Sequence, residues 1–475
     1  MRTNFHTCLG AGLALVVATS CGDDGPSLFE SASADSTAGD DTTRGDAGPG
    51  SQGTGASESN GNGTDGSGGG VDETTGGGLK LDVGDPGTID PGCDCDLSYL
   101  WITDHSSNNL NSIQSPNSVL KINTKTLEIE GRYLTRPDGQ GNPSRTSVNL
   151  AGDVVVANRH GGLTKFYANL ENCQDTNGMP GIQTSTDDQA LPWNQEECRA
   201  WHVDFGKNNQ RPVAWTGGTQ AGCDATGAKV WTVTTMSNGF LPGVGGSGAT
   251  AYLVDGDTGA IEATIDIPDF NSGGLIGLGP YGAAVDAEGN LFFTPNTIGM
   301  SNMHLARVDR ISHEVTLWPL PVHTYGITVD HAGRVWTANI FGSIGARFDP
   351  ETETWSTIAG AGGGSGLTQG PDAQMYLSIG STVRAFNVET LEQGQQWSNE
   401  QTVKGVSFDA DGYLWAVTYR GTDSDDVPTS FEAFAYKIDP MTMTTVGQVG
   451  GLRDPYTYSD MTGNVLNTVA CVPAG

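Results

Sequence analysis

The sequence predicts an all-β fold, a β-propeller, which follows a long polar segment. Similar stretches recur along the chain at intervals of about 40 to 60 residues, the period of propellers and related arrays. Each copy contains short apolar runs that are separated by turn residues. No stretch beyond the N-terminus has helical periodicity. Four strands in each repeat predict blades arranged around a channel.

The first 20 residues have the features of an export signal. Arg2 provides a positive charge, and the apolar run 9–17 is too short to span a bilayer as a mature helix. Small residues follow it and lead to Cys21. The segment resembles a bacterial lipoprotein signal, which implies cleavage before Cys21 and attachment of a diacylglycerol to its thiol. The alternative is an ordinary cleavable signal with an unrelated cysteine.

Residues 21–92 are predicted to form a disordered linker. From 22 to 90 the chain is rich in Gly, Ser, Thr, Asp and Asn, and its aromatic and basic residues are limited to Phe29, Arg44 and Lys80. Such a composition cannot bury enough apolar surface to offset the chain entropy. We expect the linker to tether the folded domain, 93–475, to the outer membrane, at its periplasmic face or on the cell surface. Outer-membrane placement is the expectation because the residue after the lipoprotein cysteine is a glycine, whereas an aspartate there often signals inner-membrane retention.

The charge balance argues against a nucleic-acid partner. The chain has 23 Lys and Arg residues against 55 Asp and Glu residues, and a formal net charge of -32. Phosphate backbones are bound by clustered basic residues, which this composition does not favour. An acidic surface of this kind suits the solubility of an exported protein.

Six cysteines follow Cys21, and an even number in an oxidising compartment favours disulfides. They are Cys93, Cys95, Cys173, Cys198, Cys223 and Cys471. Cys173 and Cys198 bracket a polar insertion at about 171–200, so we expect a bond that closes this loop and contributes about 3 kcal/mol. Cys471 lies near the C-terminus, and a bond to Cys93 or Cys95 would join the two ends of the domain. Structural zinc is the competing interpretation, but the spacing of Cys93 and Cys95 is too short for it.

The clearest copies of the repeat are hairpins in which the same residue types recur. They read YGAAVDAEGNLFFT (281–294), YGITVDHAGRVWT (325–337) and KGVSFDADGYLWA (404–416). In each, a short strand ends at an aspartate, a turn closes on a glycine, and a second strand carries an aromatic residue. The aspartates and glycines are Asp286, Asp330, Asp409, Gly289, Gly333 and Gly412. Aspartate caps tight turns and glycine tolerates positive φ, so these positions predict β-hairpins.

The chain ends predict how the ring closes. The first strands of the domain, 99–104, 119–123 and 128–134, match the second, third and fourth strands of a blade whose first strand is missing. We expect residues 456–463 to supply that strand, because a ring closed by both chain ends leaves no exposed edge. The other blades start near residues 145, 212, 281, 325, 366 and 404. The prediction is therefore seven four-stranded blades, with six or eight as alternatives.

The hairpin pattern is similar to that of the streptogramin (virginiamycin B) lyases and of NHL repeats. The resemblance covers most of residues 97–463 and implies a propeller fold. In the lyases a histidine before the glycine of one first strand and a glutamate after the next strand act with magnesium to open a cyclic ester. Here the corresponding residues are Tyr281, Tyr325 and Lys404 for the histidine, and Pro295, Ala338 and Val417 for the glutamate. The lyase catalytic pair is therefore not matched, and no catalytic residue is assigned.

Polar residues at the ends of the predicted second strands should gather at one mouth of the channel. Together with two residues at the starts of first strands, they would form a pocket for an anionic or sugar-like ligand. For any single residue, a hydrogen bond between blades is the alternative role. The candidates are Asp104, His105, Arg145, Asn158, Arg159, His160, Asn296, Tyr325, Asn339, Tyr419 and Arg420.

A candidate calcium loop lies within the insertion. Residues 175–185, DTNGMPGIQTS, resemble the Asp-x-Asn-x-Asp-Gly-x-Ile pattern, in which alternate oxygens coordinate calcium. Asp175 and Asn177 match two ligands, whereas Met179 and Pro180 replace the third ligand and the glycine. A polar loop stapled by a disulfide is the favoured interpretation, and a calcium ion held by Asp175 and Asn177, as a cofactor, is the alternative.

These features favour a membrane-anchored extracytoplasmic module that binds a carbohydrate, peptide or protein partner, or serves as a scaffold. The alternative is an extracytoplasmic enzyme of the lyase or lactonase type with a rearranged, metal-dependent site. The sequence contains no Ser-His-Asp signature, phosphate-binding glycine loop or cofactor fingerprint.

Overall fold

The computed structural model describes most of the predicted propeller domain. The described residues are 98–104, 117–221, 223–236, 248–270, 276–298, 303–419, 421–422, 428–430, 432–458 and 460–470. The predicted signal peptide, the lipidation site and the linker lie outside these residues, and so do His105 and Arg420 and the cysteines Cys93, Cys95 and Cys471. No helix in the described part of the chain is long and apolar enough to cross a membrane.

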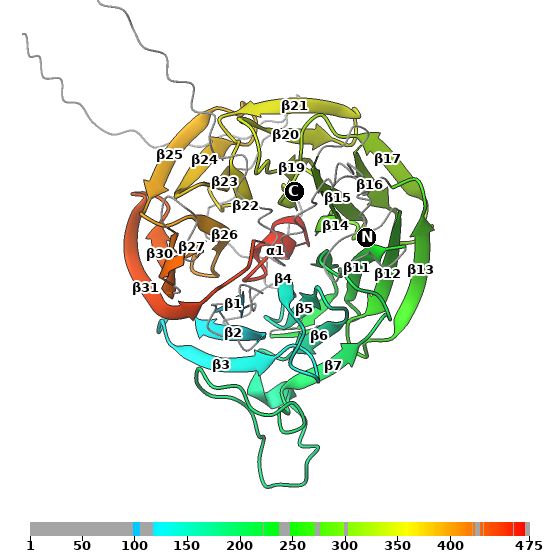
Figure 1. Cartoon of the computed structure of the whole chain (residues 1–475), viewed down its shortest axis with the longest axis vertical. Coiled ribbons are helices and arrows are strands. Elements are labelled where there is room, and N and C mark those ends of the chain that lie inside the picture. The colour runs from blue at the N-terminus through cyan, green and yellow to red at the C-terminus, as the bar shows by residue number, and fades with distance from the viewer. Residues whose placement is uncertain are drawn as a thin grey trace, which may run out of the picture. The chain divides into compact units, whose positions relative to one another are not determined.

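The described strands form seven blade-like sheets around a central axis (Figure 1). Blades 2 to 7 each have four antiparallel strands, and blade 1 has three. In the four-stranded blades the chain runs from the innermost strand to the outermost one. The prediction of a seven-bladed, all-β propeller is confirmed.

The first blades are built as the repeat pattern predicts. Blade 1 contains β1 (Tyr99–Asp104), β2 (Ser118–Asn123) and β3 (Ile129–Leu134). Blade 2 contains β4 (Pro143–Val148), β5 (Val154–Asn158), β6 (Leu163–Phe166) and β7 (Arg199–Val203). Blade 3 contains β8 (Val213–Trp215), β11 (Lys229–Thr235), β12 (Ala249–Asp255) and β13 (Ile261–Ile267). Blade 4 contains β14 (Ile276–Val285), β15 (Leu291–Ile298), β16 (His304–Val308) and β17 (Val315–Pro319).

The remaining blades follow the same order. Blade 5 contains β18 (Ile327–Val329), β19 (Val335–Thr337), β20 (Ile344–Asp349) and β21 (Thr354–Ala359). Blade 6 contains β22 (Gly364–Gln369), β23 (Gln374–Ile379), β24 (Thr382–Asn387) and β25 (Gln393–Ser398). Blade 7 contains β26 (Val403–Phe408), β27 (Leu414–Thr418), β30 (Glu432–Asp439) and β31 (Thr444–Arg453).

Both ends of the domain build blade 1. The segment after β31 runs beside β1, where the Tyr456 N–H donates to the carbonyl of Thr103 (2.8 Å). Further along, the Trp101 N–H donates to the carbonyl of Met461 (2.8 Å). The C-terminal segment thus acts as the innermost strand of blade 1, and the closure predicted for residues 456–463 is confirmed.

The hairpin turns have the predicted geometry. Asp330 Oδ1 accepts a hydrogen bond from the backbone N–H of Arg334 (2.9 Å), and Asp286 and Asp409 cap their turns in the same way. Gly333, in the turn after Asp330, has a φ of 79°, which glycine adopts without the steric cost that other residues would meet.

Adjacent blades approach closely at the glycines near the starts of their first strands. A Cβ atom on Gly326 would lie 2.0 Å from the carbonyl oxygen of Ser365, and one on Gly405 would lie 2.6 Å from that of Thr457. Both distances are far below van der Waals contact. Glycine therefore stands at these positions because the innermost strands of neighbouring blades pack backbone against backbone.

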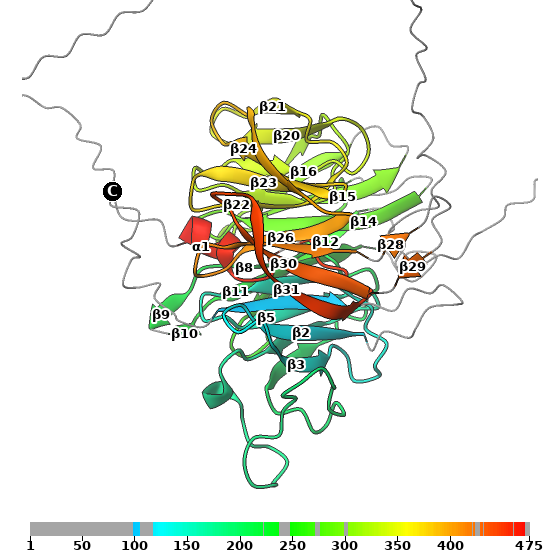
Figure 2. The same ribbon diagram turned by 90° about the vertical axis from the view of Figure 1, so that its left-hand side faces the viewer.

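The described residues include one short α-helix, which the sequence shows by no helical periodicity. This helix, α1 (Asn464–Ala470), has seven residues and buries Leu466 and Val469. It lies over the ring centre in Figure 1, and Figure 2 shows it on one face of the ring, with the hairpin β28–β29 (Gly421–Thr422 and Pro428–Ser430) on the opposite face. It follows directly after the segment that closes the ring.

The polar insertion lies between β6 and β7 and projects from the rim of blade 2 (Figure 1). It begins with a short 3-10 helix, η1 (Leu170–Asn172), and the predicted disulfide between Cys173 and Cys198 staples its two ends. Cys223 is also disulfide-bonded. It lies in the turn of a second small hairpin, formed by β9 (Thr219–Ala221) and β10 (Asp224–Thr226).

Candidate functional site

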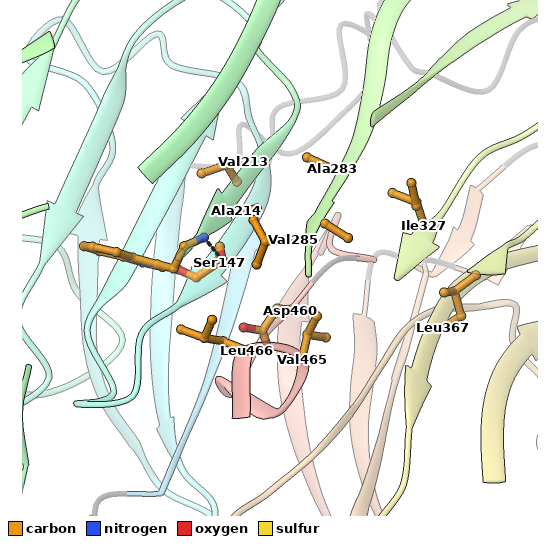
Figure 3. Close-up of a pocket in the computed structure, with 12 residues that line it drawn as sticks. Ser147, Val213, Ala214, Ala283, Val285, Ile327, Leu367, Asp460, Val465 and Leu466 are labelled. Atoms are coloured by element: carbon orange, nitrogen blue, oxygen red, sulfur yellow. Dashed lines mark hydrogen bonds between the residues drawn. The ribbon is translucent and has the colours of Figure 1, made fainter. Parts of the chain in front are cut away.

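The channel is filled at the end where α1 lies. Apolar side chains of the innermost strands meet Val465 and Leu466 of the helix there, and the space left is about 20 Å³ (Figure 3). Asp460 borders this space, and burial raises the pKa of its carboxyl to about 6. A volume of this size suits a single water molecule. This end of the channel is therefore packed core and has no room for an organic ligand.

Toward the opposite ends of the same strands, five tyrosines form a buried cluster. The hydroxyl of Tyr456 lies 2.5 Å from that of Tyr325 and 3.0 Å from that of Tyr281, so the hydroxyls form a chain of hydrogen bonds. Tyr458 stacks on Tyr281 with ring centroids 5.7 Å apart. The members are Tyr281, Tyr325, Tyr419, Tyr456 and Tyr458.

Four basic side chains lie against these tyrosine rings, and none is more than 5% exposed. The Arg159 guanidinium is 4.3 Å from the centroid of Tyr456, and Lys404 Nζ is 5.2 Å from that of Tyr419. Such geometries give cation–π attraction. We call the five tyrosines and these four residues the basic tyrosine centre. The basic residues are Arg145, Arg159, Arg211 and Lys404.

Arg145 is the most informative member of the centre. Its guanidinium lies 3.9 Å from the Tyr458 centroid and 5.0 Å from the Tyr281 centroid, and the side chain is 1% exposed. Nη2 donates to the carbonyl of Tyr325 (3.2 Å), whereas Nε has no hydrogen-bond partner among the described residues. Within the part of the chain that the structure describes, Arg145 forms no ion pair with a carboxylate. A buried guanidinium therefore keeps unused donor capacity at the ring centre.

The centre contains four of the residues that the sequence predicted for a ligand pocket: Arg145, Arg159, Tyr325 and Tyr419. They come from three blades, because Arg145 and Arg159 both belong to blade 2. Arg159 follows β5, where its Nη1 donates to Asn142 Oδ1 (2.6 Å), and Tyr419 follows β27. The expectation that strand ends converge at one end of the channel holds for these residues.

Other predicted pocket residues hold the fold together. Asp104 is buried and forms an ion pair with Arg132 of β3. Asn158 is also buried, and its Nδ2 donates to the carbonyl of Thr135 (3.0 Å). The Asn158 bond joins blade 2 to the segment after β3 of blade 1, which is the alternative role, whereas the Asp104 ion pair lies within blade 1.

Asn339, Asn296 and His160 are the remaining candidates among the described residues. Asn339 Oδ1 accepts a hydrogen bond from the N–H of Phe341 (3.0 Å) and shapes its turn. Asn296 is buried near the end of β15, and no residue in the described part of the chain forms a hydrogen bond with its Oδ1. His160 is partly buried, which lowers the pKa of its imidazole, and its Nδ1 lies 2.6 Å from the carbonyl oxygen of Gln140.

Five members of the centre were not selected from the sequence: Arg211, Lys404, Tyr281, Tyr456 and Tyr458. Tyr281 and Lys404 were considered only as replacements of the lyase histidine. Both stand five residues before the turn aspartate of their repeats, as Tyr325 does. This shared position could have identified them, because equivalent positions in the blades of a propeller face the same central axis.

The loop that was predicted to bind calcium is folded around a carboxylate. Glu197 Oε1 accepts a hydrogen bond from the N–H of Asn177 (2.8 Å), and Oε2 accepts one from the N–H of Gln183 (2.8 Å). These amides, led by that of Gln183, lower the pKa of Glu197. Asn177 Oδ1 accepts from the N–H of Met179 (2.8 Å), and Asp175 is exposed. No group of three His, Cys, Asp or Glu side chains among the described residues is placed to hold a metal ion; calcium binding stays a prediction.

The chain has distant similarities to solved structures. No family model and no curated protein matches the chain. A streptogramin B lyase structure is 14% identical, with 67% of this chain and 94% of that chain covered and a TM-score of 0.43. Virginiamycin B lyase from Staphylococcus aureus is 14% identical, with 64% and 83% covered and a TM-score of 0.40. A Lactobacillus plantarum protein is 11% identical, with 77% and 98% covered and a TM-score of 0.47. The chain is thus similar to these solved structures at 11 to 14% identity.

Proposed function

We propose that this protein is an envelope-anchored binding module that recognises an anionic ligand at the basic tyrosine centre. The observation that carries the proposal is Arg145, whose buried guanidinium faces two tyrosine rings and forms no ion pair with a described carboxylate. A peptide, protein or carbohydrate partner would be recognised through a carboxylate or phosphate group that it carries.

The physical argument concerns the cost of a buried charge. A cation–π contact contributes about 0.5 to 2 kcal/mol, whereas a charge taken out of water loses several kcal/mol of hydration. The contacts of Arg145 with Tyr281 and Tyr458 therefore offset only part of that loss. An anion that accepted hydrogen bonds from the guanidinium would compensate for the rest, because its planar fork matches carboxylate and phosphate oxygens.

The proposal is tested by isothermal titration calorimetry of the whole protein with citrate and with inorganic phosphate at constant ionic strength. We expect at least one of these anions to bind. The Arg145→Gln variant, which removes the charge and keeps a polar side chain of similar length, should weaken that binding at least about tenfold. As a control, Arg384→Gln alters a partly exposed arginine of blade 6 that contacts Gln393 and Gln396, and it should leave binding unchanged.

Two results would overturn the proposal. One is the absence of binding for both anions up to about 10 mM. The other is an Arg145→Gln variant that is folded by circular dichroism and binds the anion as tightly as the unaltered protein. In that case the arginine would serve only to hold the C-terminal tyrosines in the ring.

Anchoring is the second part of the proposal. The support for it is the sequence itself, in which a short apolar run and small residues precede Cys21 and a Gly- and Ser-rich segment follows it. We expect the mature protein to partition into the detergent phase, to incorporate labelled fatty acid, and to fractionate with the outer membrane. Cys21→Ser should abolish the labelling and the detergent partitioning. Labelling that survives this substitution would contradict the anchor at Cys21.

A further inference from the structure

A second cavity lies at the rim of blade 2, between the outermost strand β7 and the disulfide-bonded insertion. Its volume is about 370 Å³, within the range of about 300 to 1,000 Å³ that is usual for small-molecule sites. The strands β4, β5 and β6 separate β7 from the channel. This cavity is therefore distinct from the basic tyrosine centre, and the inference drawn from it does not depend on that centre.

Aromatic side chains form part of its wall. Trp201 of β7 is held by a hydrogen bond from its Nε1 to the carbonyl of Gly256 in blade 3 (3.0 Å). Trp193 comes from the insertion, with the Arg199 guanidinium 4.0 Å from its ring centroid and the His202 ring edge-on at 5.5 Å. Indole rings fixed in this way offer rigid apolar faces beside polar groups.

The charges around the cavity do not favour an ionic ligand of either sign. Glu196 and Glu197 lie on its wall near Arg199, so an anion would meet two carboxylates and a cation would meet the guanidinium. Burial lowers the pKa of the His202 imidazole, which is therefore neutral near pH 7. A neutral ligand with hydroxyl groups is the class that this wall suits.

The carboxylates also shape the wall. Glu196 accepts hydrogen bonds from the Thr184 hydroxyl (2.6 Å) and the Cys198 N–H (2.9 Å), while Glu197 binds the backbone of the loop 176–183. Cys198 itself is bonded to Cys173, with the two Cα atoms 4.5 Å apart. The insertion is thus fixed to β7 by a covalent bond and a set of hydrogen bonds, so the cavity exists before a ligand arrives.

We propose that this cavity binds a neutral saccharide unit. A pyranose ring presents an apolar face of C–H groups, which suits the ring of Trp193, and a rim of hydroxyls that both donate and accept hydrogen bonds. Arg199 supplies a polar partner at the wall, and the exposed Gln174 lies at its border, whereas His202 Nδ1 is engaged with the Thr164 hydroxyl (2.8 Å). The insertion interrupts an otherwise regular blade, and this site gives it a function.

The test uses calorimetry and tryptophan fluorescence on the whole protein with cellobiose, maltose and N,N′-diacetylchitobiose. At least one disaccharide should bind and change the fluorescence. Trp193→Ala should weaken that binding about tenfold or more, because it removes the apolar face that the insertion supplies. Trp355→Ala is the matched control, because this tryptophan is also partly buried but lies on β21 of blade 5, and it should bind as the unaltered protein does. The double variant Cys173→Ser, Cys198→Ser should also bind more weakly.

The proposal is overturned if none of the three disaccharides binds up to about 10 mM. It is also overturned if Trp193→Ala, folded by circular dichroism, binds as tightly as Trp355→Ala. Phosphate and citrate in the same assay serve as charged probes, and their binding in competition with the disaccharide would contradict the assignment to a neutral ligand.

Discussion

The aspartate at the end of each first strand has a role beyond its turn. Asp330 is fully buried, and its Oδ2 accepts hydrogen bonds from Trp336 Nε1 (2.9 Å) and Arg334 Nε (2.8 Å). An asparagine would place an N–H where one of these donors points. We expect Asp330→Asn to lower the free energy of unfolding by about 2 to 4 kcal/mol, measured by urea denaturation.

Asp286 provides the matched control for that substitution. It caps the equivalent turn through Asn290, but the second strand of its repeat carries Phe292 where Trp336 stands, so no indole N–H depends on it. Asp286→Asn should cost about 1 kcal/mol or less. Equal losses for the two variants would show that the turn cap, and not the buried indole, accounts for the effect.

Part of the basic tyrosine centre was predictable from the positions of single residues in the repeats. Arg145 and Tyr325 lie near the starts of first strands, and Arg159 and Tyr419 follow second strands. Superposing the repeats was therefore enough to select these four residues. Tyr458 was not selected, because it lies in a segment without the Asp-x-x-Gly hairpin that sets the alignment of the other blades. Its place was fixed by pairing with β1, which is a contact between distant parts of the chain.

Among the elements, α1 shows where local patterns give no information. Its sequence, NVLNTVA, contains Val, Asn and Thr, which have low helix propensity, and its seven residues are too few for periodicity to show. The helix is stabilised by burying Leu466 and Val469 against the ring. Tertiary packing therefore decides its conformation, whereas the hairpins were predictable because their turns need particular residues.

Asp460, at the start of the segment that leads into α1, makes stability depend on pH. Its carboxyl has a pKa of about 6 against an ordinary value of 3.8, chiefly because of burial. The folded protein then holds a proton that the unfolded chain has released, so this stabilisation is complete below pH 4 and is lost as pH rises through about 6. The difference amounts to about 3 kcal/mol.

This dependence is checked by measuring unfolding between pH 4 and pH 7 for the unaltered protein and for Asp460→Asn. The stability of the unaltered protein relative to the variant should fall across that range, because asparagine has no proton to lose. A difference that stays constant with pH would show that the carboxyl titrates at its ordinary value when folded.

The predicted calcium site lies in the insertion. If Asp175 and Asn177 bind calcium as the sequence pattern indicates, millimolar Ca²⁺ should raise the melting temperature, and Asp175→Asn should abolish the rise. Magnesium at the same concentration is the control. The ion would have to compete with the backbone amides for Glu197, which already accepts from Asn177 and Gln183. An unchanged melting temperature would contradict the calcium site.

At the scale of the whole molecule, the ring and its blade count were predictable because each blade repeats one set of local rules. The closing blade was predictable because residues 99–104 match the second strand of a blade, and no first strand precedes them. The two proposed ligand sites could not be predicted from the repeat pattern in the same way. One depends on side chains from several blades, and the other on an insertion that no other blade has.

Closure by the C-terminal segment yields the final prediction. Removing residues 455–475 would expose the edge of β1, since Trp101 would lose the carbonyl of Met461 and Thr103 would lose the N–H of Tyr456. An unpaired edge promotes association with other chains. We expect this truncated protein to form oligomers in size-exclusion chromatography and to lose hydrogen-exchange protection in β1.

Removing only residues 464–475 is the matched control, because both truncations lack α1 and Cys471 but this one keeps the strand beside β1. It should remain monomeric with β1 protected, and it should melt at a lower temperature because Leu466 and Val469 no longer cover the channel end. Equal loss of protection in both proteins would mean that the helix closes the ring. If only the protein without residues 455–475 loses protection, the strand closes the ring, because the protein without residues 464–475 keeps the hydrogen bonds along β1.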